Sequence, residues 1–137
     1  MSRRLRNKIN EEKMIVGIGT DIIEIPRIEK AIQEYGERFL KRIFTDTERN
    51  YCEQFKDTRV LHYAARFAAK EAFSKAIGTG ITDGFKFSEI GVKNEQSGKP
   101  RIELFGGLAK QWGDCIVLVT LSHSDKNAIA FVIIEQC

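Results

Sequence analysis

Larger, mostly apolar residues alternate with small or polar ones with a period of two in the segment from Met14 to Ile25. Because side chains two residues apart lie on the same face of a β-strand, this pattern predicts a strand. One face of that strand carries Gly17 and Gly19 ahead of Asp21, so it is nearly bare. Glycines weaken a strand unless another backbone or a ligand comes close, and we therefore expect a close approach beside Asp21.

A helical spacing of apolar residues follows this strand. It predicts one helix from Pro26 to Gly36 and a shorter one from Phe39 to Phe44, because apolar positions recur every three or four residues. Thr45 and Glu48 have the spacing of a capping box, in which each side chain bonds to the backbone N–H of the other residue. They predict a third helix that begins near Thr45.

The longest helical segment runs from Val60 to Ile77, and its apolar residues lie almost all round the helix. A helix of this kind is covered on most of its sides by the rest of the fold. Glu71 lies among the apolar neighbours, where an ionised carboxylate is costly unless a cation or a metal ion is beside it. Lys75 is one turn further on and is the nearest candidate partner, although an ordinary exposed Glu–Lys pair has the same spacing.

After Gly80 the period returns to two. Four further strands are predicted: Phe85–Lys93, Arg101–Phe105, Cys115–Ser122 and Ala128–Glu135. Residues 94–100 join the first two strands and are rich in turn-forming residues, which predicts a hairpin. An N-terminal strand, helices that include one long buried helix, and a C-terminal run of antiparallel strands predict a single α+β domain over residues 14–137.

The charge of the chain is unevenly distributed. The 137 residues carry a net charge of +3, with 22 Lys and Arg and 19 Asp and Glu. Residues 1–13 hold five of these cations and two of the acids, which leaves 17 of each in residues 14–137. A nucleic-acid-binding domain concentrates its cations on the folded part, so this class of protein is disfavoured. Residues 1–13 are interpreted as a basic N-terminal extension.

Three cysteines, Cys52, Cys115 and Cys137, lie far apart in the sequence and form no Cys-x-x-Cys pair. This spacing disfavours both a disulfide framework and a structural zinc site, and it predicts a reducing compartment, most simply the cytoplasm. No apolar run is long enough to span a bilayer, and the N-terminal arginines are not followed by the apolar stretch of a signal peptide. We therefore expect no membrane partner.

Two carboxylates, Asp21 and Glu71, are the most economical pair to bind one hard cation. Magnesium typically takes one or two protein carboxylates and completes its coordination with water and phosphate oxygens. Cations and a glycine-rich loop that could hold such phosphates lie around Glu71 in the sequence: Arg66, Lys70, Lys75 and the loop Gly78-Thr79-Gly80. This set predicts metal-assisted phosphoryl chemistry and leaves the substrate open.

Three segments follow one another in the order of a known family: residues 17–28 (GIGTDIIEIPRI), residues 66–80 (RFAAKEAFSKAIGTG) and residues 121–124 (LSHS). They resemble the holo-(acyl carrier protein) synthases, which are the small phosphopantetheinyl transferases. The resemblance implies a magnesium-dependent enzyme of fatty acid biosynthesis. Such an enzyme transfers 4′-phosphopantetheine from coenzyme A (CoA) to a serine of the apo acyl carrier protein and releases adenosine 3′,5′-bisphosphate. The resemblance also implies a homotrimer with sites between subunits.

By this resemblance, Asp21 and Glu71 bind the metal ion, and Glu71 and Lys75 are the catalytic residues. Lys75 would stabilise negative charge beside the diphosphate. Glu71 is a metal ligand first and a base second, because metal binding weakens a carboxylate as a base. Contacts to CoA are assigned to Arg66, Lys70, Lys75, Gly78, Thr79, Gly80 and His123. For His123, a surface histidine at a turn is the alternative.

The carrier proteins that this family modifies are acidic, so a cationic docking face is expected. Cationic residues recur at three- and four-residue steps on the first two predicted helices. We assign carrier binding to Arg27, Arg38 and Arg42. A solvated helix face, with acids interleaved among these cations, is the alternative.

Two other classes of function stay open. A different magnesium-dependent phosphotransferase or nucleotide-hydrolysing enzyme would use the same pair of acids, and a CoA turnover assay separates it. A non-enzymatic module that binds nucleic acid through its basic extension would lose binding without residues 1–13, whereas a transferase would stay active.

Overall fold

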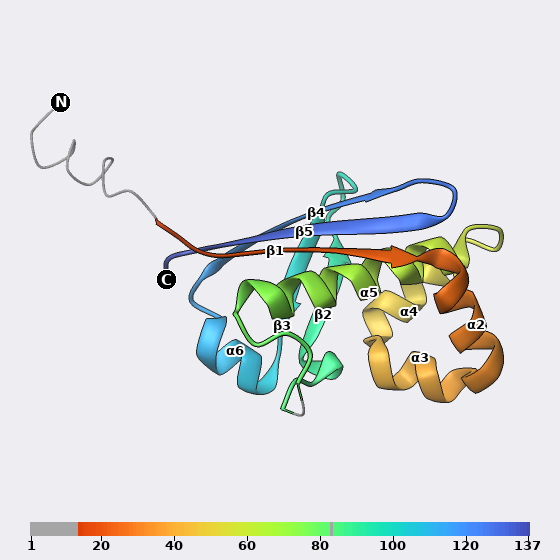
Figure 1. Ribbon diagram of the computed structural model, residues 1–137, viewed down its shortest axis with the longest axis horizontal. Helices are drawn as coiled ribbons and strands as arrows, with labels where there is room; N and C mark the ends of the chain where they lie inside the picture. The colour runs from red at the N-terminus through yellow and green to blue at the C-terminus, as the bar shows by residue number, and fades with distance from the viewer. Residues whose placement is uncertain (1–13, 83) are drawn as a thin grey trace, which may run out of the picture.

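The structure is a computed structural model that describes residues 14–82 and 84–137, so the basic extension 1–13 lies outside the described residues. The chain forms the predicted α+β domain (Figure 1). Its elements, in order, are β1 (Ile15–Glu24), α2 (Ile25–Tyr35), α3 (Glu37–Ile43), α4 (Asp46–Cys52), α5 (Arg59–Ala76), the 3-10 helix η1 (Phe87–Glu89), β2 (Ile90–Asn94), β3 (Pro100–Leu104), α6 (Gly106–Trp112), β4 (Ile116–His123) and β5 (Asn127–Glu135).

The strands form two antiparallel sheets. The larger sheet has the order β1-β5-β4, and the smaller one pairs β2 with β3. Figure 1 shows α5 running along β1 and β5, with α2, α3 and α4 gathered at one end of the molecule and α6 at the other. The core lies between α5 and the larger sheet, because the residues of β5 that face the helix, among them Ala130 and Val132, are fully buried.

The bare face of β1 packs against the backbone of α5. A Cβ atom added to Gly19 would collide with the carbonyl oxygen of Ala72, and one added to Gly17 would collide with that of Ala76. The close approach expected beside Asp21 is therefore confirmed, and its partner is the helix backbone. Side chains at positions 17 and 19 would push α5 away from the strand that carries Asp21.

The opposite face of the larger sheet is apolar and uncovered within the described residues. Ile18 and Leu118 are both paired with Ile133, and Ile22 is paired with Ile129, so these side chains share one face. Ile18 and Ile22 are 61% and 60% exposed. A contiguous exposed apolar face of this kind marks an interaction surface.

Local sequence signals set most element boundaries. The capping box of Thr45 and Glu48 is confirmed at the start of α4, and Gly36 ends α2 with a positive φ of 54°. The predicted strand 85–93 is correct only in its second half. Its first half forms η1, and β2 begins at Ile90.

The expectation of three unpaired cysteines is wrong for two of them. Cys115 and Cys137 are joined by a disulfide, whereas Cys52 is free and buried. Because β4 and β5 are antiparallel and Ile116 pairs with Glu135, the segment between the two cysteines folds back as a hairpin and closes a sequence separation of 22. The spacing of the cysteines along the sequence does not show that the hairpin brings them together. Among the described residues, no helix is long and apolar enough to cross a membrane.

Candidate active site

The fold brings Asp21 and Glu71 together, although 50 positions separate them in the chain. Asp21 pairs with Ala130 across the sheet, which directs its side chain toward α5, and only 9% of it is exposed. Glu71 lies on α5, close enough to Asp21 for the charge of Asp21 to act on it. The predicted meeting of the two acids is therefore confirmed.

The environment of Glu71, which includes Asp21, perturbs its ionisation. The pKa of Glu71 is raised from 4.5 to about 7, first by burial and then by the proximity and negative charge of Asp21. The positive charges of Lys75 and Arg27 oppose this shift and are smaller causes. Two acids placed this close favour sharing a proton, or a cation that offsets both charges.

Lys75 is the cation nearest to this pair, but its ion pair is with Asp21 and not with Glu71. Its Nζ donates to Asp21 Oδ1 at 2.8 Å and to the carbonyl oxygen of Thr20 at 3.1 Å. The hydrogen bond to Asp21 is the main cause that raises the pKa of Lys75. Because 52% of the Lys75 side chain is exposed, its ammonium group can also reach a ligand beside the acids.

The acid pair fits a divalent cation. Asp21 Oδ2 is buried and has no hydrogen-bond partner in the described part of the chain, so it is free to bind a metal ion. No group of three or more His, Cys, Asp and Glu that could hold a metal occurs within residues 14–82 and 84–137. The two carboxylates alone would suffice for magnesium, which fills its other positions with water or phosphate oxygens.

Lys70, predicted to contact CoA, is in the wrong place for that role. It is fully buried, and its Nζ donates to Glu48 Oε1 at 2.6 Å. It also donates to the carbonyl oxygens of Ile43, Ile90 and Phe87 at 2.7, 2.9 and 3.3 Å. Consecutive helical residues are rotated by about 100°, so Lys70 points into the core while Glu71 points to the acid site. Glu48, expected to be solvated or capping, caps α4 and is buried.

Arg66 and His123 meet at a second position, a cavity of about 240 Å³. The guanidinium of Arg66 lies 4.3 Å from the ring centre of Tyr51, and it donates to the carbonyl oxygen of His62 and to Asn94 Oδ1. The cavity is lined by Tyr51, Leu61, His62, Ala65, Arg66, Asn94, Gly98, Pro100, Thr120, Leu121, Ser122 and His123. The structure thus joins two of the residues assigned to CoA.

His62 is a site residue that the sequence reasoning missed. Its ring stacks on Phe55, with the ring centres 4.0 Å apart, and it lines the cavity of Arg66 and His123. Burial, followed by the charges of Arg66 and His123, lowers the pKa of His62. A usable signal was its position four residues before Arg66, which places both side chains on one helix face.

The loop Gly78-Thr79-Gly80 ends α5, and the N–H groups of its two glycines are bonded within the fold. The N–H groups of Gly78 and Gly80 donate to the carbonyl oxygens of Lys75 and Ser74, at 3.0 and 2.9 Å. Both glycines have positive φ, which fits a helix C-terminus. The C-terminal end of a helix also repels anions. A contact of this loop with CoA would therefore not use the N–H groups of Gly78 and Gly80, and the contact stays a prediction. The Thr79 hydroxyl donates to the carbonyl oxygen of Gly80 at 2.9 Å.

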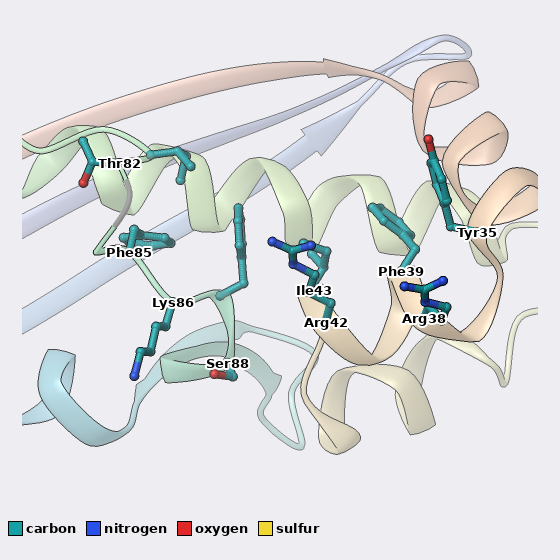
Figure 2. Close-up of a pocket in the computed structure, with 11 residues that line it drawn as sticks. Tyr35, Arg38, Phe39, Arg42, Ile43, Thr82, Phe85, Lys86 and Ser88 are labelled. Carbon is teal, nitrogen blue, oxygen red and sulfur yellow. The ribbon is translucent and has the colours of Figure 1, made fainter.

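The three arginines assigned to the carrier protein do not form one group. Arg38 and Arg42 are exposed on α3 and line a cavity of about 820 Å³, along which Figure 2 shows their side chains. We call this the α3 cavity; its lining residues are Tyr35, Arg38, Phe39, Arg42 and Ile43 on one side and Ile81, Thr82, Phe85, Lys86, Phe87 and Ser88 on the other. Arg27 is exposed on α2, and its charge acts on Glu71.

Residues 17–132 match the model of the 4′-phosphopantetheinyl transferase superfamily. The chain is 46% identical over 129 residues to a holo-(acyl-carrier-protein) synthase of Brucella ovis, in an alignment covering 89% of this chain and 96% of the relative.

Two solved structures are also similar. One is a holo-(acyl-carrier-protein) synthase from Bacillus anthracis in complex with CoA (3′,5′-ADP). It has a TM-score of 0.77 and 43% identity, over 90% of this chain and 99% of that one. The other, from Helicobacter pylori in complex with coenzyme A, has a TM-score of 0.75 and 32% identity, over 85% of this chain and 98% of that one.

Proposed function

The chain belongs to the 4′-phosphopantetheinyl transferase superfamily, and we propose how its residues carry out the reaction of a holo-(acyl carrier protein) synthase. The enzyme transfers the 4′-phosphopantetheine group of CoA to a serine of an apo acyl carrier protein, in fatty acid biosynthesis. The other product is adenosine 3′,5′-bisphosphate. One observation supports the assignment of roles to residues: Asp21 lies next to Glu71, and its buried Oδ2 has no hydrogen-bond partner among the described residues.

Asp21 and Glu71 bind the magnesium ion in this proposal. When bound, the cation would offset negative charge on the diphosphate of CoA and on the leaving phosphate oxygen. Lys75 is held by Asp21 and Thr20, so its ammonium group is positioned beside the same phosphates. Glu71 is a ligand first. Taking the proton of the serine hydroxyl is its secondary role, because metal binding weakens a carboxylate as a base.

The cavity of Arg66 and His123 is proposed to take a phosphate group at the nucleotide end of CoA. Arg66, His62 and His123 supply positive or titratable groups there, and Tyr51 supplies an aromatic face. Lys70 and the amides of Gly78 and Gly80 are left out of the CoA contacts, since their hydrogen bonds are made within the fold.

The acidic carrier protein is proposed to dock at the α3 cavity. Arg38 and Arg42 offer positive charge on its rim, while Phe39 and Phe85 offer apolar surface for a helix of the carrier. Arg27 is proposed to meet the carrier at the other end of this face, next to the acid pair. Docking there would bring the serine of the carrier toward Glu71 and Lys75.

A homotrimer with shared sites is proposed as the active form. The apolar face of the larger sheet supports this, because Ile18, Ile22 and Leu118 would be costly to leave in water. Among the described residues, no residue contacts both Arg66 and Asp21, so the cavity of Arg66 and the acid pair are two separate parts of the site. In a trimer, the acid pair of one subunit could face the cavity of its neighbour. The shared-site arrangement also fits a small chain with a large substrate.

Residues 14–137 are proposed as the transferase domain, and the cytoplasm as its compartment. In a reducing cytoplasm the Cys115–Cys137 disulfide is expected to be open, because cytosolic disulfides are rare. Removal of residues 1–13 should leave transfer intact.

The deciding experiment mixes the chain with apo acyl carrier protein, CoA and magnesium, and then weighs the carrier protein. A mass gain of one phosphopantetheine group, lost on chelation of the metal, is the expected result. A carrier in which the acceptor serine is replaced by alanine is the control. Phosphate release from a nucleotide without a mass gain on the carrier would instead indicate the alternative, a different magnesium-dependent phosphotransferase or nucleotide-hydrolysing enzyme.

A further inference from the structure

Lys70 is a charged residue with no place in the reaction described above. Both it and its partner Glu48 are 0% exposed, which is rare for charged side chains. Their ion pair is not explained by stability alone, because apolar residues of the same shape often replace a buried ion pair at little cost. We therefore ask which elements of the fold these hydrogen bonds hold in place.

Those contacts reach both walls of the α3 cavity. Ile43 is the last residue of α3, and Phe87 is the first residue of η1 on the opposite wall. Both residues line the cavity, and the carbonyl oxygens of both accept hydrogen bonds from Lys70 Nζ. A third carbonyl, that of Ile90, fixes the start of β2 to the same ammonium group.

Glu48 holds the ammonium group in place from a third direction. Its Oε1 accepts hydrogen bonds from Lys70 Nζ and from the backbone N–H of Thr45, at 2.6 and 2.9 Å. Its Oε2 accepts from the N–H of Val92 in β2, at 3.0 Å. The pair therefore ties α4, β2 and the ends of both cavity walls to α5, and Glu71 of the acid site is the next residue on that helix.

We propose that Lys70, anchored by Glu48, is a positioning residue that sets the separation of the two walls of the α3 cavity and aligns the docked carrier protein with the acid site. This inference rests on the proposed docking of the carrier protein at that cavity. It assigns Lys70 an effect on the carrier protein and none on CoA. The α3 cavity should be able to widen when the ammonium group is removed, because no other described side chain binds both Ile43 and Phe87 through their carbonyls.

The test uses Lys70→Met together with Glu48→Gln, so that neither change leaves a buried charge unpaired. Initial rates are measured with carrier protein varied at saturating CoA, and with CoA varied at saturating carrier protein. The KM for the carrier protein should rise about tenfold or more, while the KM for CoA stays within about twofold of the wild-type value. Val132→Ala is the matched control: it also removes buried contacts, but in β5, and should lower stability without changing either KM.

Three results would overturn the inference. One is an unchanged KM for the carrier protein in the double variant. The second is a parallel rise of both KM values, which would place Lys70 in the nucleotide site. The third is an equal rise of the carrier KM in Val132→Ala, which would show that lost stability alone causes the rise. If the double variant does not fold, Lys70→Gln with Glu48→Gln decides: it leaves no buried charge, replaces the ammonium group by a shorter amide, and should still raise the carrier KM severalfold. A wild-type chain that adds no mass to the carrier would refute the proposed function instead.

Discussion

Asp21 and Glu71 lie close together, and burial and the charge of Asp21 raise the cost of ionising Glu71. The structure relieves part of that cost through Lys75, which bonds to Asp21 Oδ1 and leaves Oδ2 without a partner. Asp21 and Glu71 could hold a magnesium ion, and its charge would offset the rest. The charge state of this pair is therefore coupled to metal binding, and single substitutions can test it.

Asp21→Asn and Glu71→Gln should each lower the rate of phosphopantetheine transfer by about 100-fold or more at limiting magnesium, because each removes a charged metal ligand. The rate is followed by the mass of the carrier protein, and circular dichroism checks that the fold is kept. Glu24→Gln is the matched control, since Glu24 is exposed at the end of β1. Near-normal turnover in both site variants would contradict the metal assignment.

Glu71 should also make the stability of the metal-free protein depend on pH. Its folded pKa of about 7 lies above the ordinary 4.5, so the folded state binds the proton more tightly and this contribution is lost as the pH rises through 7. Glu71→Gln, which mimics the protonated acid, should therefore be more stable than the wild type at pH 8 by about 1–2 kcal/mol after allowance for solvent screening, and by much less at pH 5. Urea unfolding in a chelator measures both values, and a difference independent of pH would refute this prediction.

At the scale of whole elements, the position of the acid site depends on how closely β1 and α5 approach. Gly17 and Gly19 allow the strand to lie against the carbonyl groups of the helix, and this contact carries Asp21 to Glu71. On the other side of α5, Lys70 connects the helix to the ends of α3 and η1. The helix thus links the acid site to the α3 cavity.

Gly19→Ala should destabilise the fold by about 1–3 kcal/mol or more and reduce transfer, because the added methyl group collides with the backbone of α5. Thermal or urea unfolding measures the first effect. Gly84→Ala is a suitable control, because a Cβ atom at Gly84 has no neighbour within 4 Å and should change stability by less than about 0.5 kcal/mol. Equal stability losses in the two variants would argue against the close-approach explanation.

Arg42→Glu on α3 should raise the KM for the carrier protein, and the increase should shrink as salt is added, because rim charges act mainly through screened long-range attraction. The KM for CoA should stay unchanged. Lys110→Glu on the exposed surface of α6 provides the charge-matched control. If the KM for CoA rose as much as that for the carrier protein, Arg42 would belong to the nucleotide site.

At the scale of the whole molecule, the features of the site are split over one chain. The acid pair lies between β1 and α5, whereas Arg66 and His123 line a separate cavity near the β2–β3 hairpin. The uncovered apolar face of the larger sheet lies on the side away from α5. Assembly through that face would remove apolar area from water and could bring the acid pair of one subunit to the cavity of another.

Ile18→Glu should dissociate the assembly and abolish most of the transfer activity, while the fold of each subunit survives because Ile18 is exposed. Light scattering at the assay concentration measures the mass. Phe105→Glu, which changes an exposed aromatic outside the larger sheet, is the control. Mixing inactive Asp21→Asn and Arg66→Ala subunits should restore part of the activity if the site is shared. A fully active wild-type monomer would exclude the shared site.

The amino-acid sequence by itself determined the local structure and the identity of the central acids. The alternation in β1 and the capping box of Thr45 and Glu48 depend on neighbours only a few residues away, so they could be predicted. The pairing of Asp21 with Glu71 was predicted from the bare face of β1 and the carboxylate within an apolar helix, and the resemblance of two segments to one family agreed with it. The charge of the chain likewise required no coordinates.

Only the tertiary structure decided what each side of α5 contacts. The apolar residues of this helix surround it, so no helical wheel could tell that Lys70 enters the core while Glu71 faces the acid site. The partners of Lys70 come from α3, α4, η1 and β2, between 17 and 27 residues away. The disulfide of Cys115 with Cys137 follows from the pairing of β4 with β5. Such contacts depend on how distant segments pack, and packing is a property of the whole chain that local sequence patterns do not encode.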